Sequence, residues 1–424
     1  MENRYFLKEC KLVPTEGSSL KQEFEISAGN PLISYYESIK SPAISLTLTF
    51  LDVDQLVSRE GITGGEYLSL KVKKEGHDDF ELKADKHFLM LNSVKDVSTS
   101  SSKQVATLEF VSVETIVNET ARVNKKYTGN ISDTVMQLLI GDKRGIGTSK
   151  KLFGPVDEKL GETDVEKDRA TNSYSFVGNL KRPFDTIQWL CPKAASTDDE
   201  CGFLFYETLD GYYFKSIKTL LEGEPIVYEK PEKTPTPAGI GDFKIIENNL
   251  DTSNDVGMNC RMGMYSNKTI YINIDNATEK IVDYRISGMN LKKPPKLPNK
   301  LEDFPTRLML RVLDKGALQK GSKKEEIQKE NELAIYQSKS YARANLIFSQ
   351  SMGISIPFNP ELRAGQMLDL KFPLRKGDDQ ATTTYGSESD DDVSGKYLIS
   401  ELKHIIGGNR ANTELTLIRD MFTA

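Results

Sequence analysis

The feature that most constrains this chain is an internal repeat between its two ends. Residues 65–72, Gly-Glu-Tyr-Leu-Ser-Leu-Lys-Val, align with residues 365–372, Gly-Gln-Met-Leu-Asp-Leu-Lys-Phe, at an offset of 365 − 65 = 300 positions. Strands that alternate apolar and polar residues occur in many unrelated hairpins, so one matching strand is weak evidence for a repeat. Further matching blocks follow in the same order. These blocks are 88–90 with 397–399, 94–95 with 402–403, and 107–110 with 414–417. Together they predict one β-unit present in two copies.

In each copy a glycine turn precedes an alternating strand. A period of two places alternate side chains on one face of a strand, as the stretch 43–53 also shows. Residues 1–118 are therefore predicted to be an all-β domain. In the first copy, the positions expected to shape the turn and the strand are Gly65, Leu68 and Leu70. In the second copy, they are Gly365, Leu368 and Leu370.

The middle of the chain has a different character. Helices are predicted to begin near Ile131 and Pro183, and an aromatic hairpin is predicted over 202–214. The fold class is α+β, mainly β, with two similar tube-forming antiparallel β-barrel-like domains, an α+β module between them and a smaller inserted domain. The predicted divisions are 1–118 (first tube β-domain), 119–222 (α+β module), 223–280 plus 336–424 (second tube β-domain) and 281–335 (inserted lateral domain).

Charge and cysteine content exclude several function classes. The 424 residues carry 56 basic and 62 acidic side chains, a formal net charge of −6, so no strong positive field exists for a nucleic-acid backbone. The four cysteines (10, 191, 201 and 260) lack metal-binding spacing, so we expect them reduced and mostly buried; a Cys191–Cys201 pair is the alternative. No run approaches the ~18 apolar residues of a membrane span. We expect a protein of the cytoplasm, or of a particle assembled there.

Catalytic and metal-binding patterns are weak. The histidines at 77, 87 and 404 belong to no hydrolase motif. The stretch 141–150 misses the spacing of a phosphate-binding loop, and the acidic stretch 390–392 lacks the register of a calcium loop. We therefore expect no enzyme activity, no cofactor and no metal. Aromatic residues around Trp189 and in the hairpin leave a carbohydrate-binding surface module, or a cryptic peptidoglycan hydrolase, as the alternatives.

A signature near the C-terminus adds a family resemblance. It reads Leu-x-x-Gly-x-x-Leu-x-Leu, then Gly-x-Tyr-x-Ile-x-x-x-x-His, then Thr-x-Leu-x-Leu-x-Arg. With the segments 174–176, 183–185 and 202–214, it resembles the baseplate central hub subunits of T-even-type contractile-tailed phages. More distantly, it resembles late-control tail proteins and the hub part of type VI secretion spike proteins. The residues are Leu362, Gly365, Leu368 and Leu370; Gly395, Tyr397, Ile399 and His404; and Thr413, Leu415, Leu417 and Arg419.

The resemblance implies a structural virion protein of the tail baseplate, assembled in the host cytoplasm. Three subunits with two similar domains each would form a homotrimer with a pseudo-sixfold ring. That ring would join a trimeric spike or tail-lysozyme protein to the hexameric tail tube or its tube-initiator proteins. Its channel would admit the tape-measure protein and, later, DNA without sequence-specific binding. Because a β-branched residue resists positive φ, Gly65→Val and Gly365→Val are each expected to impair ring assembly.

Overall fold

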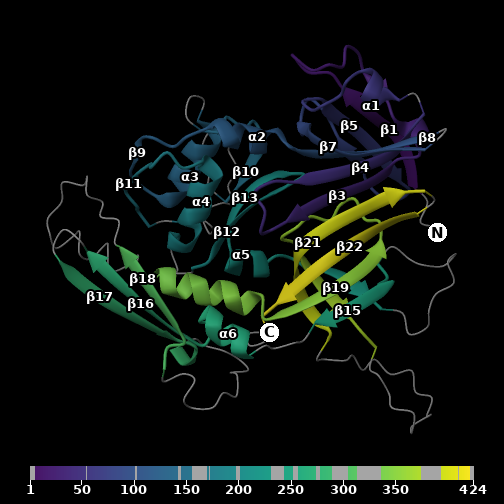
Figure 1. Cartoon of the computed structure of the whole chain (residues 1–424). Coiled ribbons are helices and arrows are strands. Elements are labelled where there is room, and N and C mark those ends of the chain that lie inside the picture. The colour runs from purple at the N-terminus through teal and green to yellow at the C-terminus, as the bar shows by residue number, and fades with distance from the viewer. Residues whose placement is uncertain are drawn as a thin grey trace, which may run out of the picture.

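The structure is a computed structural model and is mainly β (Figure 1). Its descriptions cover residues 5–53, 55–100, 103–141, 145–154, 170, 172–196, 201–230, 243–251, 256–273, 277–288, 304–312, 336–373, 393–408 and 410–420. Much of the insertion predicted at 281–335 and the acidic stretch 390–392 fall outside these residues. Among the described helices, none is long and apolar enough to cross a bilayer.

One sheet of 14 strands contains the first and the last described strands of the chain. We call its first part the N-half and its second part the C-half. The N-half comprises β1 (Tyr5–Val13), β2 (Phe24–Glu25), β3 (Leu32–Ser38), β4 (Ser45–Asp52), β5 (Tyr67–Lys74), β6 (Phe80–Leu82), β7 (Leu89–Ser100) and β8 (Lys103–Ser112), with helix α1 (Leu56–Arg59). The C-half comprises β14 (Ile226–Glu229), β15 (Glu247–Asp251), β19 (Gln350–Pro357), β20 (Met367–Lys371), β21 (Gly395–Gly407) and β22 (Arg410–Arg419).

The two halves have the same order of neighbouring strands. In the N-half the order is β3-β4-β8-β7-β5, and in the C-half it is β15-β19-β22-β21-β20, with antiparallel pairing throughout. The next strands differ, because β1 runs antiparallel to β5 whereas β14 runs parallel to β20.

The register of the strands matches as well. Leu91 lies opposite Phe110 in the N-half, and Ile399 lies opposite Leu417 in the C-half. In both halves a β-bulge follows directly, at Asn92 and at Ser400, and normal pairing then resumes. A bulge inserts one unpaired residue and bends the strand, so a shared bulge is a specific likeness.

The register corrects one block of the sequence alignment. Ile399 corresponds to Leu91, whereas the sequence comparison aligned it with Met90. A slip of one residue exchanges the two faces of a strand. The run 88–91 is apolar at every position, so its alternation does not define a register.

We expected two separate barrel-like domains, but the described strands form an open path that ends at β15 and β2 rather than a closed barrel. The reason is that β3 pairs with β21 and merges the halves into one sheet. One hydrophobic core lies under both halves, and it contains Leu48, Leu68 and Phe110 together with Leu368 and Leu415.

An α+β unit between the halves has its own core, and we call it the module (Figure 1). Its hairpin lies where the sequence predicted it, over 202–214, and turns at Leu209 and Asp210, since Thr208 pairs with Gly211. Its elements are α2 (Val113–Thr120), β9 (Lys126–Tyr127), α3 (Ile131–Ile140), β10 (Lys151–Phe153), β11 (Phe176–Val177), α4 (Pro183–Leu190), β12 (Phe203–Thr208), β13 (Gly211–Ser216) and α5 (Ile217–Leu221).

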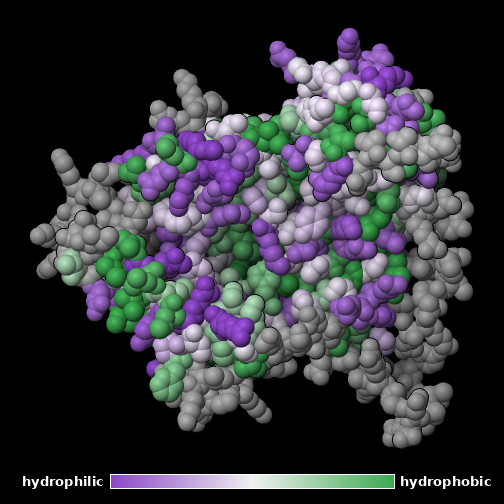
Figure 2. Space-filling model, in the orientation of Figure 1, coloured by the Kyte–Doolittle hydropathy of each residue, from purple (hydrophilic) through white to green (hydrophobic). Residues whose placement is uncertain are grey.

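A separate three-stranded sheet, which we call the small sheet, lies far from the N-half in Figure 1. It comprises β16 (Ser266–Asn273), β17 (Thr278–Arg285) and β18 (Arg307–Val312), with α6 (Val256–Met262) nearby. A helix over 336–347 covers one face, where the Thr269 and Ser338 hydroxyl oxygens are 2.9 Å apart. The other face is exposed and apolar and forms a green patch in Figure 2; it includes Ile281, Leu308, Leu310 and Val312.

Candidate functional site

The pairing of β3 with β21, which we call the seam, is the central feature of the molecule. His404 lies on β21 opposite Tyr35 on β3 and is fully buried. Its Nδ1 is 2.9 Å from the Thr413 hydroxyl oxygen. The ring of Tyr35 stacks on it at 5.8 Å between centroids, and Phe80 and Phe358 meet it edge-on at 5.4 and 5.1 Å. A histidine from the C-half is thus enclosed by aromatic rings from both halves.

The environment of His404 suits packing rather than proton transfer. Burial, with a smaller contribution from Arg363, lowers the pKa of His404 to about 3. The imidazole is therefore neutral near pH 7. Its Nε2 is buried and has no hydrogen-bond partner among the described residues. The neutral ring fills the seam and makes one hydrogen bond.

The repeat glycines occupy equivalent turns. Gly65 has φ +99° and Gly365 has φ +87°, a region that favours glycine. The Gly65 amide donates to the Leu91 carbonyl at 3.0 Å, and the Gly365 amide donates to the Ile399 carbonyl at 2.9 Å. The four repeat leucines are buried in the core under both halves: Leu68, Leu70, Leu368 and Leu370.

Tyr397 anchors the start of β21. Its ring is fully buried, and its hydroxyl donates to the Val393 carbonyl at 2.8 Å. The guanidinium of Arg419, another signature residue, lies 4.7 Å from the ring centroid. Two of the signature residues near the C-terminus, Tyr397 and Arg419, therefore contact each other, and this contact stabilises the C-half.

Sequence reasoning missed a buried carboxylate beside the seam. Glu37 on β3 is fully buried and accepts hydrogen bonds from the Tyr35 hydroxyl at 2.6 Å and from two backbone amides, Leu209 and Ala364, at 2.8 Å each. Burial raises the pKa of Glu37, while the nearby Arg363 acts in the opposite direction. Leu209 belongs to the module and Ala364 to the C-half, so Glu37 connects three parts of the molecule.

A second buried carboxylate attaches the module to the N-half. Glu207 on β12 accepts from the Ile44 amide at 3.1 Å, from the Ser112 hydroxyl, and from the Lys150 ammonium at 2.6 Å. Lys150 also donates to Glu114 at 2.7 Å. Burial raises the pKa of Glu207. A buried charge is tolerated when it is paired and hydrogen-bonded, and that condition is met here.

Only a weak signal for these residues exists in the sequence. With 62 acidic residues in the chain, no single glutamate stands out. Glu207 does interrupt an aromatic strand, Phe-Leu-Phe-Tyr-Glu-Thr. However, an acidic residue on the solvent-facing side of a strand is common, so the sequence alone does not indicate that Glu207 is buried. Lys150 ends the glycine- and lysine-rich stretch that was compared with a phosphate-binding loop. Instead of binding phosphate, its ammonium lies between two carboxylates.

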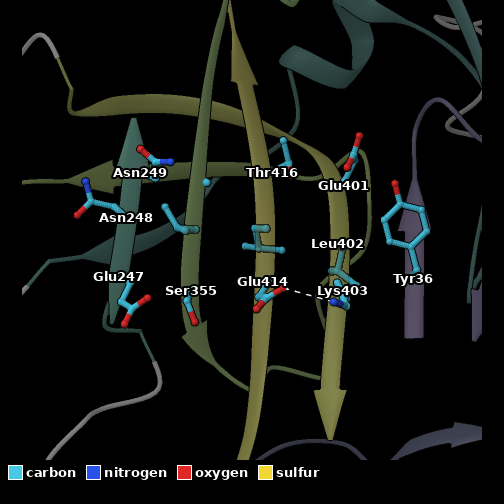
Figure 3. Close-up of a pocket in the computed structure, with 13 residues that line it drawn as sticks. Tyr36, Glu247, Asn248, Asn249, Ser355, Glu401, Leu402, Lys403, Glu414 and Thr416 are labelled. Atoms are coloured by element: carbon cyan, nitrogen blue, oxygen red, sulfur yellow. Dashed lines mark ion pairs between the residues drawn. The ribbon is translucent and has the colours of Figure 1, made fainter. Parts of the chain in front are cut away.

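The outward face of the sheet is polar around the seam. A depression of about 450 Å³ lies across β15, β19, β22, β21 and β3. Figure 3 shows the residues that line it. The side chains stand in rows on separate strands, and the ion pair that Figure 3 marks joins Lys403 and Glu414 at 3.7 Å. Within the described residues, no group of three or more His, Cys, Asp or Glu side chains is placed to hold a metal. The polar lining residues include Tyr36, Glu247, Asn249, Ser355, Glu401, Lys403, Glu414 and Thr416.

The aromatic residues that suggested a sugar platform lie in the interior. Tyr206, Tyr212 and Phe214 are buried. Trp189 is partly buried, packs on Phe176 with centroids 5.2 Å apart, and is covered by the Lys193 ammonium 3.6 Å from its ring. These rings build the cores around the module, so no described aromatic platform faces solvent here.

Comparisons with known proteins place this fold. No protein-family model and no curated protein matches the sequence. Among solved structures, a tail protein from Neisseria meningitidis matches with a TM-score of 0.52 and 10% identity, covering 99% of this chain and 98% of that one. The 43 kDa tail protein of prophage MuSo2 from Shewanella oneidensis matches with a TM-score of 0.53 and 9% identity, covering 98% and 99%.

The chain has the fold of phage tail proteins. The resemblance inferred from the sequence is thereby confirmed at the level of fold, along nearly the whole chain. A type VI secretion component from Escherichia coli also matches, with a TM-score of 0.43 and 9% identity over 98% of this chain and 76% of that one. The fold assignment rests on the first two structures.

Proposed function

We propose that this protein is a non-enzymatic hub subunit of a phage tail baseplate and forms a homotrimeric ring. The observation that carries the proposal is the pair of halves with one strand order and one bulge position, in a fold shared with tail proteins. Three copies of a chain with two equivalent halves present six similar wall segments around a threefold axis. Such a ring can join a trimeric spike to a hexameric tube.

The polar face of the sheet is the proposed wall of the channel. The opposite face is covered by the hydrophobic core, so only the polar face is available to line a lumen. Around the seam this face carries Glu247, Glu401 and Glu414 against Lys403. An acidic, hydroxyl-rich and amide-rich wall repels phosphates rather than binding them. The tape-measure protein and DNA could then pass without adhering.

The other parts are assigned to the outside of the ring. The module is attached to the large sheet through buried contacts such as those of Glu37 and Glu207. The small sheet lies far from the N-half (Figure 1). The two ends of the ring would bind the spike or tail-lysozyme protein and the tube or tube-initiator proteins. The proposed location is the virion tail baseplate, assembled in the host cytoplasm.

The test is the mass in solution, measured by light scattering on the protein alone and with the spike protein encoded beside it. We expect three times the 47.6 kDa of one chain, either alone or after spike addition. A monomer under both conditions would contradict the ring. Cleavage of purified peptidoglycan above background would instead support the hydrolase alternative, and binding of sugars would support the carbohydrate-binding alternative.

A further inference from the structure

We infer that strand β7 of one copy pairs with strand β15 of the next copy and so closes the ring as one continuous sheet. This inference rests on the proposed ring and names the strands that form its contacts. Two observations support it: the large sheet has two edges without a strand partner among the described residues, and the β3–β21 seam shows how the equivalent strands would pair.

Both edges lack a strand partner in the described part of the chain. β15 stands at the end of the strand order and pairs with β19 alone. β7 pairs with β8 along its length, but β5 reaches its other side only at Met90. Bare strand edges readily add another strand, and folded proteins usually cover or interrupt them. A ring provides the cover when each edge meets its complement on a neighbouring copy.

The seam shows how these edges fit together. By position in the shared strand order, β3 corresponds to β15 and β21 corresponds to β7. Inside one chain, β3 pairs with β21. The equivalent contact would be β15 with β7, and within the described part of one chain these two strands do not pair. The missing contact is therefore expected between copies, where it alternates with the seam around the ring.

The register of the contact can be derived from the seam. His404 pairs with Thr413 as Val97 pairs with Ala106, so Val97 is the counterpart of His404. Because β7 has one further bulge at Lys95, we align the residues of β7 that follow Lys95 with β21 through their partners on β8 and β22.

On the other strand, Leu250 is the counterpart of Tyr35, because each lies opposite an equivalent residue, Met352 or Leu46. The seam pairs His404 with Tyr35, Ile405 with Ser34 and Ile406 with Ile33. The predicted pairs between copies are Val97 with Leu250, Ser98 with Asn249, and Thr99 with Asn248.

Disulfide trapping tests this pairing in the full chain. The variant is Ser98→Cys with Asn249→Cys, in a background with Cys260→Ser because the other three native cysteines are buried. Residues directly opposite on antiparallel strands have Cβ atoms about 4.5–5.5 Å apart, close enough for a disulfide after small adjustment. Oxidation should produce covalent trimers on a non-reducing gel. A second pair, Thr99→Cys with Asn248→Cys, guards against misfolding of the first.

The matched control is Ser98→Cys with Ser355→Cys. Ser355 lies on β19, the next strand inward, opposite Glu247. Neighbouring strands are about 4.8 Å apart, and two such spacings would separate β7 of one copy from β19 of the next. This pair is therefore too distant for a disulfide and should stay uncrosslinked. Crosslinking of the control as efficiently as of both test pairs would overturn the register.

Light scattering on the reduced variants separates the two claims. Trimers that form no crosslink with either test pair would overturn the strand pairing and leave the ring intact. Monomers that form no crosslink, both alone and with the spike protein added, would overturn both. Covalent trimers from a test pair, with none from the control, are the expected result.

Discussion

The N-half and the C-half build the same five strands and differ where other parts attach. At the turn before β5, a Cβ added to Gly65 would meet only the Thr15 hydroxyl oxygen at 3.9 Å. At the equivalent turn before β20, a Cβ added to Gly365 would lie 2.1 Å from the Tyr206 hydroxyl oxygen of the module. The strand scaffold is therefore shared, while the packing on it is specific to each half.

The same contrast holds at the long strands. In the C-half, β21 is covered by β3, and its His404 is enclosed by rings. In the N-half, the corresponding part of β7 has no strand on that side within the described residues. Two halves with the same strand order thus differ at this position: β21 forms an internal joint, whereas the corresponding part of β7 is a bare edge within the described residues.

The largest expected effect separates the two glycines. Gly365→Ala combines positive φ with overlap against Tyr206, and we expect a loss of about 4 kcal/mol in the free energy of unfolding. Gly65→Ala carries the backbone strain alone, about 1–2 kcal/mol. Denaturant unfolding of both variants measures the difference. Equal losses would show that the module does not constrain the C-half turn.

Next in size is the buried ion group that attaches the module to the N-half. Lys150→Met leaves Glu114 and Glu207 buried without their cation, which is expected to cost about 3 kcal/mol. Thermal unfolding measures the loss. The control is Lys8→Met, which removes the exposed Lys8–Asp79 pair at 3.8 Å and should change stability by less than about 1 kcal/mol. Similar results from both lysines would contradict the role assigned to Lys150.

A smaller effect concerns pH and the seam. The pKa of His404 is about 3 in the folded chain, below the ordinary value of 6.5. Below pH 6.5 the unfolded chain therefore binds a proton that the folded chain does not, and stability falls as the pH is lowered.

His404→Phe should remove up to about 1.4 kcal/mol per pH unit of this fall between pH 6 and 4. The pKa of His87, in the N-half, is also lowered, to about 4, mainly by burial, so His87→Phe should act in the same direction. Denaturant midpoints across this pH range give both slopes. An unchanged slope for His404→Phe would mean that the ring is hydrated.

The smallest effect is expected on the polar face. Lys403→Ala breaks an exposed ion pair with Glu414 and should change the free energy of unfolding by less than about 0.5 kcal/mol. The ring should assemble with the same mass. A loss above 2 kcal/mol would show that this face is a packed interface rather than a channel wall.

Much of the strand scaffold could be predicted from the sequence, because alternation at 43–53 and the repeated glycine turns have few structural solutions. The strand β1 and the seam could not, since pairing between distant strands leaves no local periodicity. Among the functional positions, the repeat residues could be found as a pattern. Glu37 and Lys150 could not, because their burial depends on the module folding against the sheet.

The most direct test of the account is the structure of the assembled ring by electron cryomicroscopy, with the spike protein added if it is needed for assembly. We predict three copies around one axis, with the N-half and the C-half of each chain related by a rotation of about 60° about that axis. Halves related by any other axis, or a chain that stays monomeric with the spike present, would contradict the claim that the repeat builds a ring.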